Sequence, residues 1–150
     1  MPPVHSIDSI HALFSPLTTL TFLEILALGG GGMLGTVLRY WLAASALRTA
    51  GPDFPYGILA ANLLGSFGIA FAVAALATLF QNQPAWRLFL IVGFFGSFTT
   101  FSTFSLDLLI FFQRGAVGVG IGYCLASVLG GVLLAWGGWN LGLLFRSAAV

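Results

Sequence analysis

The feature that most constrains this chain is a series of long apolar stretches separated by short polar breaks. Charged residues make up 6% of the 150 residues, hydrophobic residues make up 59%, and none of the basic residues is a lysine. The surface of a soluble domain is roughly 25–35% charged, so this chain cannot cover itself with charged side chains in water. The sequence therefore predicts an all-α integral membrane protein.

A transmembrane helix needs about 20 mostly apolar residues, and four stretches of this chain are long enough. The predicted spans cover residues 20–47, 56–80, 86–112 and 116–145. Together they predict one transmembrane domain of four helices over residues 20–146.

The N-terminal segment, residues 1–19, lacks the basic region of a cleavable signal peptide. Ile7, Ile10, His11 and Phe14 recur at helical spacing, which favours a short helix lying on the membrane surface. A tail without structure is the alternative interpretation.

Cysteine and histidine usage argues against hydrolytic, zinc and disulfide chemistry. Cys124 is the single cysteine and lies inside the fourth span, while His5 and His11 both lie in the N-terminal segment. No cluster has the spacing of metal ligands, and no Ser/His/Asp set can share one pocket.

The glycines match two different motifs. Gly30 to Gly35 fit G-x-G-x-x-G, but a dinucleotide site needs a preceding strand and a soluble βαβ unit, which a membrane span does not provide. The spacing of Gly31 and Gly35 instead predicts a seam of small residues where two helices approach closely. The same spacing recurs at Ala61–Gly65, Gly118–Gly122 and Gly138–Gly142.

The arginines give almost no orienting bias. If the side of the membrane at residue 20 is called side A, then Arg87 and Arg146 lie on side A, and Arg48 and Arg114 lie on side B, with Arg39 near the end of the first span. Positive charge in loops normally sets orientation. Either a partner fixes the topology, or the chain inserts both ways and forms an antiparallel homodimer.

Polar side chains inside the predicted spans require partners or a water-filled cavity. Asn62 and Ser66 lie one turn apart on the second span, and Tyr123 and Ser127 lie one turn apart on the fourth. Such neutral donors, together with the positive edges of phenylalanine rings, suit a small hard anion. Each Ser and Thr could instead form hydrogen bonds that hold the helices together. The amide of Asn62 is harder to satisfy within its own helix, which favours a role in binding a ligand or lining an ion pathway.

The third span contains the stretch GFFGSFTTFSTFSLD, residues 93–107. Gly93 and Gly96 favour a break in the helix over residues 96–100, which would free backbone carbonyls in the middle of the membrane. Beyond that break, Phe101 and Phe104 lie three residues apart and share a face. The alternative for these rings is ordinary packing against lipid or neighbouring helices.

Three segments resemble the signature segments of the Fluc (CrcB) fluoride channels. They are GGGGMLGTVLRY (29–40), GILAANLLGSFGIAF (57–71) and GFFGSFTTFSTFSLD (93–107), and the resemblance covers about residues 29–145. It implies a fluoride-selective passive channel that exports cytoplasmic fluoride and so reduces its toxicity. It also implies a multi-pass protein of the bacterial inner membrane, an antiparallel dual-topology homodimer with two pores, and no nucleic-acid partner.

The resemblance also implies site residues. Main-chain carbonyls of Gly96 and Thr99 would bind a central structural Na⁺ shared across the dimer axis. The implied fluoride-pore residues are Arg39, Asn62, Phe101, Ser102, Thr103, Phe104, Tyr123 and Ser127.

The chain departs from the family pattern at four positions. Ile58 stands where a threonine of the polar track is usual, and Gly131 stands at the second small polar position of the fourth span. Asp107 replaces the more common glutamate, and Ser97 replaces the second glycine of a pair.

Two other hypotheses fit the composition. A proton-coupled small four-helix exporter, similar to the small multidrug resistance proteins, would use Glu24 on the first span. A non-transporting subunit would use its polar residues only to bond helices together.

Overall fold

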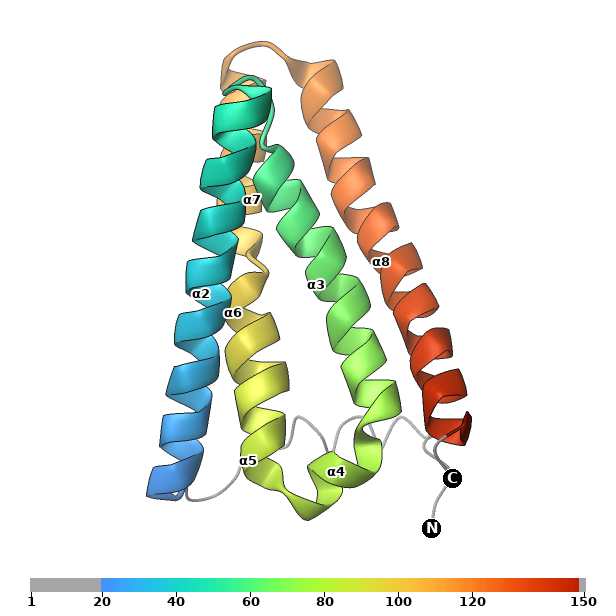
Figure 1. Cartoon of the computed structure of the whole chain (residues 1–150). Coiled ribbons are helices and arrows are strands. Elements are labelled where there is room, and N and C mark those ends of the chain that lie inside the picture. The colour runs from blue at the N-terminus through green and yellow to red at the C-terminus, as the bar shows by residue number, and fades with distance from the viewer. Residues whose placement is uncertain (1–19, 149–150) are drawn as a thin grey trace.

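The computed structural model describes residues 20–148, and every secondary-structure element in that range is a helix (Figure 1). The N-terminal segment, residues 1–19, with its predicted surface helix, lies outside the described residues. In chain order the elements are α2 (Phe22–Ala50), α3 (Tyr56–Ala75), α4 (Ala77–Asn82), α5 (Pro84–Arg87), the π-helical segment η1 (Leu88–Phe95), α6 (Gly96–Phe98), α7 (Phe101–Gln113) and α8 (Val117–Ala148).

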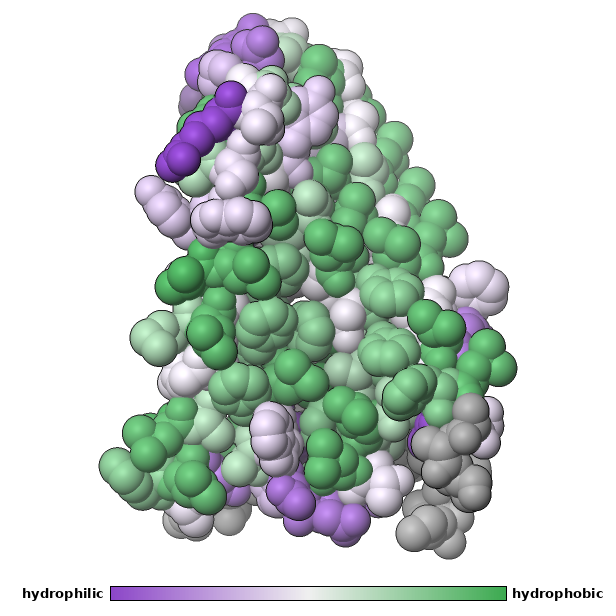
Figure 2. Space-filling view, viewed as in Figure 1, coloured by the Kyte–Doolittle hydropathy of each residue, from purple (hydrophilic) through white to green (hydrophobic). Residues whose placement is uncertain are grey.

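The prediction of four spans is confirmed. Within residues 20–148, four helical stretches are long and apolar enough to cross a membrane: Phe22–Ala50, Tyr56–Ala75, Pro84–Gln113 and Val117–Ser147. Figure 2 shows an apolar band across the middle of the molecule, with polar residues gathered towards both ends. The chain is a multi-pass membrane protein.

The second span is shorter than predicted, because the helix does not continue straight to residue 80. α3 ends before Leu76, whose backbone (φ −107°, ψ 17°) leaves the helical region, and α4 then changes direction. The bend places Phe80 in a buried cluster with Ala72, Val73 and Ile91, where only 3% of the Phe80 side chain is exposed. Burial of this ring is a physical reason for the bend.

Glycines set the two closest helix pairs, α2 with η1 and α3 with α8. A side chain on Gly31 or Gly35 would overlap the backbone of Phe89 or Phe94, so α2 and η1 are in backbone contact there. Gly138 lies equally close to α3, since a side chain there would overlap the Phe67 carbonyl group, and a Cβ at Gly142 would be 2.6 Å from the Phe71 carbonyl oxygen.

The predicted seams of small residues are therefore confirmed at Gly31–Gly35 and Gly138–Gly142. The prediction is wrong for Gly118–Gly122 within this chain. Among the described residues, no atom of another helix lies within 4 Å of a Cβ built at Gly118 or Gly122.

Candidate functional site

The third span contains two extended residues between α6 and α7. α6 ends at Phe98, Thr99 has φ −84° and ψ 157°, Thr100 has φ −150° and ψ 119°, and α7 begins at Phe101. The Thr100 hydroxyl accepts a hydrogen bond from the Thr103 amide at 3.2 Å, which is the N-cap arrangement. Thr100 therefore lies outside the helix of the first half of the span and caps the helix of the second half.

Asn62 of α3 pairs with the backbone of Thr100. The Thr100 amide donates to Asn62 Oδ1 at 2.8 Å, and Asn62 Nδ2 donates to the Thr100 carbonyl at 3.1 Å. One side chain thus replaces the helical partners of an extended residue in the middle of a span. Gly65, one turn further along α3, lets Thr99 approach, because a side chain at Gly65 would overlap the Thr99 methyl group.

The hydrogen bonds of the Thr100 and Thr103 amides leave two backbone carbonyls without the amide donor that each would have in a continuous helix. In a continuous α-helix the amide of residue i+4 donates to the carbonyl of residue i, so the Thr100 and Thr103 amides would serve Gly96 and Thr99. Here the Thr100 amide donates to Asn62 and the Thr103 amide donates to the Thr100 hydroxyl. The carbonyls of Gly96 and Thr99, predicted as ligands of a cation, are thus among the carbonyls near the extended residues that lose a helical donor.

Arg39 lies beside the same region, from α2. Its Nε donates to the Ser97 carbonyl at 3.1 Å, so the guanidinium stabilises the carbonyl end of the short helix α6. Arg39 is partly buried, and its backbone lies well inside α2, which ends at Ala50.

A cavity of about 310 Å³ brings most of the predicted site residues together. It is lined by Asn62, Ser66, Ile69, Phe95, Gly96, Thr99, Thr100, Phe101, Phe104, Ser127 and Val128. Arg39, Ser102, Thr103 and Tyr123, which were also predicted, do not line it. Ser66 could have been added from its position one turn after Asn62, whereas no sequence signal distinguishes Ile69, Phe95 or Val128.

Hydroxyl groups near the cavity differ in whether they are already bonded. The Thr100 hydroxyl donates to Thr103 Oγ1 at 3.1 Å and lies 3.3 Å from Ser102 Oγ. Ser127 Oγ is buried and has no hydrogen-bond partner among the described residues. A buried hydroxyl without a partner is costly, so Ser127 offers an unused donor in the cavity wall.

The two predicted phenylalanines lie in different surroundings. Phe101 is 80% exposed in the single chain, whereas Phe104 is 7% exposed. Their ring centroids are 5.7 Å apart, and the Phe104 centroid lies 5.2 Å from that of Tyr123, whose side chain is 1% exposed. The Tyr123 hydroxyl donates to Asp107 Oδ2 at 3.3 Å, so Tyr123 connects the Phe104 ring to a carboxyl group.

Glu24 occupies the N-terminal end of α2 and not the interior of the bundle. Its carboxylate accepts hydrogen bonds from the Thr21 amide at 2.8 Å and the Thr21 hydroxyl at 2.7 Å, forming a capping box. The carboxyl group required by the exporter hypothesis thus has a structural role at a helix end.

The three segments quoted from the sequence, residues 29–40, 57–71 and 93–107, all lie in a region that matches a known protein family. Residues 26–139 match the family described as CrcB-like protein, Camphor Resistance (CrcB). The chain belongs to the CrcB family. A relative from Agrobacterium fabrum, named fluoride-specific ion channel FluC, is 42% identical over 120 residues, which is 80% of this chain and 96% of that protein.

Further CrcB relatives carry the same name. The protein from Rhizobium etli strain CIAT 652 is 48% identical over 98 residues, covering 65% of this chain and 78% of its own length. The protein from Phenylobacterium zucineum is 45% identical over 105 residues, covering 69% and 83% respectively. The region that matches the CrcB family contains the cavity and the extended residues of the third span.

Proposed function

We propose that this chain is a fluoride-selective passive ion channel that lets cytoplasmic fluoride leave the cell through the inner membrane. The observation that carries the proposal is the cavity beside the extended residues of the third span, lined by Asn62, Phe101, Phe104 and Ser127. The names of its CrcB relatives support the same function.

The chemistry of the cavity wall suits a small anion. An amide nitrogen carries two hydrogens, and Asn62 uses one of them for the Thr100 carbonyl, which leaves the other for the cavity. Ser127 adds a buried hydroxyl without a partner, and the edges of Phe101 and Phe104 carry partial positive charge. None of the described residues lining the cavity carries a full positive charge that would hold an anion too tightly to leave.

We also propose an antiparallel homodimer. Gly96, Phe101 and Ser102 are exposed in the single chain although they lie in the middle of a span. Polar groups facing hydrocarbon are costly, so a second copy covering this region removes that cost. The balanced arginines favour insertion in both orientations.

A central Na⁺ fits the same arrangement. The Gly96 and Thr99 carbonyls have lost their helical donors, and uncharged oxygens are ligands that a hard cation accepts. Two carbonyls from each chain would meet at the dimer axis. A bound Na⁺ would supply positive charge that offsets the carbonyl dipoles and joins the two chains.

The test is fluoride efflux from liposomes containing the purified protein, driven only by the fluoride gradient. We expect fluoride to leave and chloride to be retained. Equal flux of the two ions would refute the selectivity. Glu24→Gln distinguishes the channel from the proton-coupled exporter. An exporter that uses Glu24 loses transport when Glu24 is replaced, whereas a channel retains it.

A further inference from the structure

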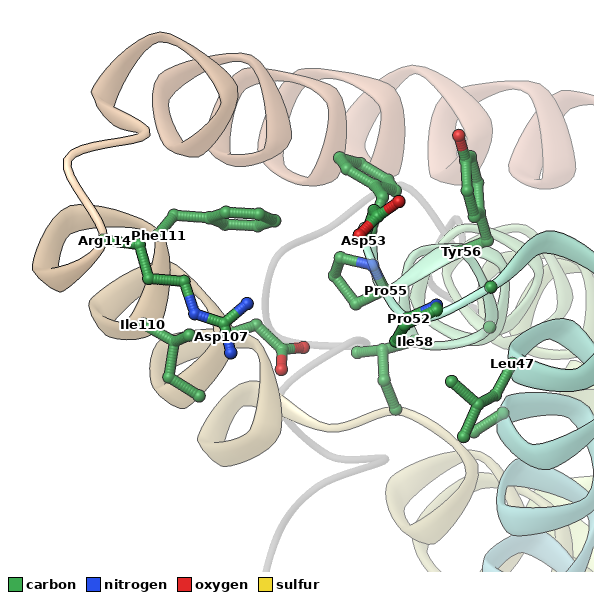
Figure 3. Close-up of a pocket in the computed structure, with 14 residues that line it drawn as sticks. Leu47, Pro52, Asp53, Pro55, Tyr56, Ile58, Asp107, Ile110, Phe111 and Arg114 are labelled. Carbon is green, nitrogen blue, oxygen red and sulfur yellow. The ribbon is translucent and has the colours of Figure 1, made fainter.

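A second cavity of about 260 Å³ lies at the side B end of the bundle (Figure 3). The last turns of α2 and α7, the loop of residues 51–55 and the start of α3 form its walls. Asp53, Asp107 and Arg114 are its charged lining residues, and Ile58 and Phe111 are among the apolar ones.

An aromatic cluster lies between this end cavity and the cavity at Asn62. Tyr123 is its centre, and the Tyr123 ring centroid is 5.2 Å from Phe104, which lines the Asn62 cavity. On the other side, the Tyr123 centroid is 5.4 Å from Phe54 and 5.9 Å from Phe111, which both line the end cavity. One buried residue thus contacts the walls of both cavities.

The Tyr123 hydroxyl also points towards the end cavity, because it donates to Asp107. Asp107 lines the end cavity, and Asp53 adds a second carboxyl group to its wall. A carboxylate on the path of an anion lowers the local anion concentration, so the end cavity needs positive charge to serve as an anion route.

Arg114 is the sole basic side chain among the residues that line this cavity in the described part of the chain. It follows the last residue of α7 and is exposed, and Figure 3 shows its side chain directed back towards the cavity. A guanidinium stays positively charged at any pH a protein experiences.

We propose that Arg114 is the residue that makes the end cavity accessible to anions and so sets the rate at which fluoride crosses the side B end. This inference rests on the proposed fluoride channel and adds an entrance residue to it. Arg114 acts by charge, without a hydrogen bond to a bound ion in a fixed site.

The size of the effect follows from Coulomb's law. A unit charge about 7 Å from the ion in water changes the local ion concentration about threefold at low salt. At an ionic strength of about 0.15 M the Debye length is about 8 Å, so much of that effect is screened.

The experiment compares Arg114→Gln with Arg48→Gln in fluoride efflux from liposomes. Arg48 lies in the last turn of α2 at the same end of the bundle, is exposed, and does not line the cavity. Each variant removes one positive charge from the side B end of the chain, so both change the balance of arginines between the two ends by the same amount. Gel filtration in detergent checks that each variant assembles like the parent.

We expect fluoride flux to fall about threefold for Arg114→Gln at low salt and much less at high salt, with Arg48→Gln at the parent rate. Arg114→Lys keeps the charge and should stay near the parent, whereas Arg114→Glu should fall by about a further threefold. Equal rates for the Gln variants, or a fall that salt does not change, would overturn the role of Arg114. A parent protein that passes no fluoride would instead refute the proposed function.

Discussion

Replacing Asn62 by leucine tests whether its side chain holds the extended residues of the third span. The substitution keeps a side chain of similar length and removes both hydrogen bonds to the Thr100 backbone. Interhelical hydrogen bonds in membrane proteins contribute about 0.6 kcal/mol each on average and up to about 1.7 kcal/mol. We therefore expect Asn62→Leu to lower the free energy of unfolding by about 1–3 kcal/mol.

Ser66→Ala is the matched control. Ser66 lines the same cavity one turn further along α3, but its hydroxyl donates to the Asn62 carbonyl of its own helix, at 2.7 Å. Bonds of this kind stabilise a helix little, so Ser66→Ala should change the free energy of unfolding by close to zero.

The measurement is unfolding by titration with sodium dodecyl sulfate, followed by tryptophan fluorescence. Fluoride efflux provides a second measurement, and Asn62→Leu should abolish it. If Asn62→Leu unfolds at the same detergent fraction as Ser66→Ala, Thr99 and Thr100 do not depend on Asn62 for their extended conformation. The Gly96 carbonyl would then lose its helical donor for a reason other than the bond from Thr100 to Asn62.

Three further predictions follow from the rings, the glycines and the arginines. Phe101→Ile removes a ring edge while keeping an apolar side chain, so fluoride efflux should fall steeply, whereas Phe94→Ile should leave efflux near the parent rate. If the two variants pass fluoride at the same rate, the Phe101 ring only packs against its neighbours. Gly31→Ala should destabilise the protein by about 1–3 kcal/mol because its Cβ meets the backbone of η1, whereas Gly29→Ala, whose Cβ meets no neighbouring element within 4 Å, should not. If both variants unfold at the same temperature, α2 and η1 are not in close contact at Gly31. Two lysines added beside Arg87 should fix one orientation, seen as a reporter at the C-terminus on one side of the membrane; a parent protein that already reports one side would exclude dual topology.

Much of the fold could be predicted from the sequence because hydrocarbon imposes a simple rule on span length. The lack of lysine and the four apolar stretches were enough to place the spans. The bend at Leu76 could not be predicted, because residues 72–80 contain neither Gly nor Pro and Thr78 is their only polar residue. The π-helical turns of Leu88–Phe95 could not be predicted either, because an apolar stretch has the same composition in an α-helix and in a π-helix.

The sequence predicted candidate site residues, most of which the structure brings to one cavity, but it did not predict the contacts between them. The motif at residues 99–104 and the amide of Asn62 inside the second span were visible in the sequence. The pairing of Asn62 with Thr100 joins residues 38 positions apart, and the bond from Arg39 to Ser97 spans 58 positions. Helical periodicity relates residues within a few turns, so it could not predict either partner.

The extended pair at Thr99 and Thr100 has a consequence for how the chain is made. α7 has 13 residues, and the helical part before the pair covers residues 84–98, so each half is shorter than the about 20 residues needed to cross a bilayer. Neither half can enter the membrane as a span by itself, and the third span must be inserted whole. Since synthesis runs from the N-terminus, the second span with Asn62 is made before Thr100. The side chain that pairs with the extended backbone thus exists before the backbone that needs it.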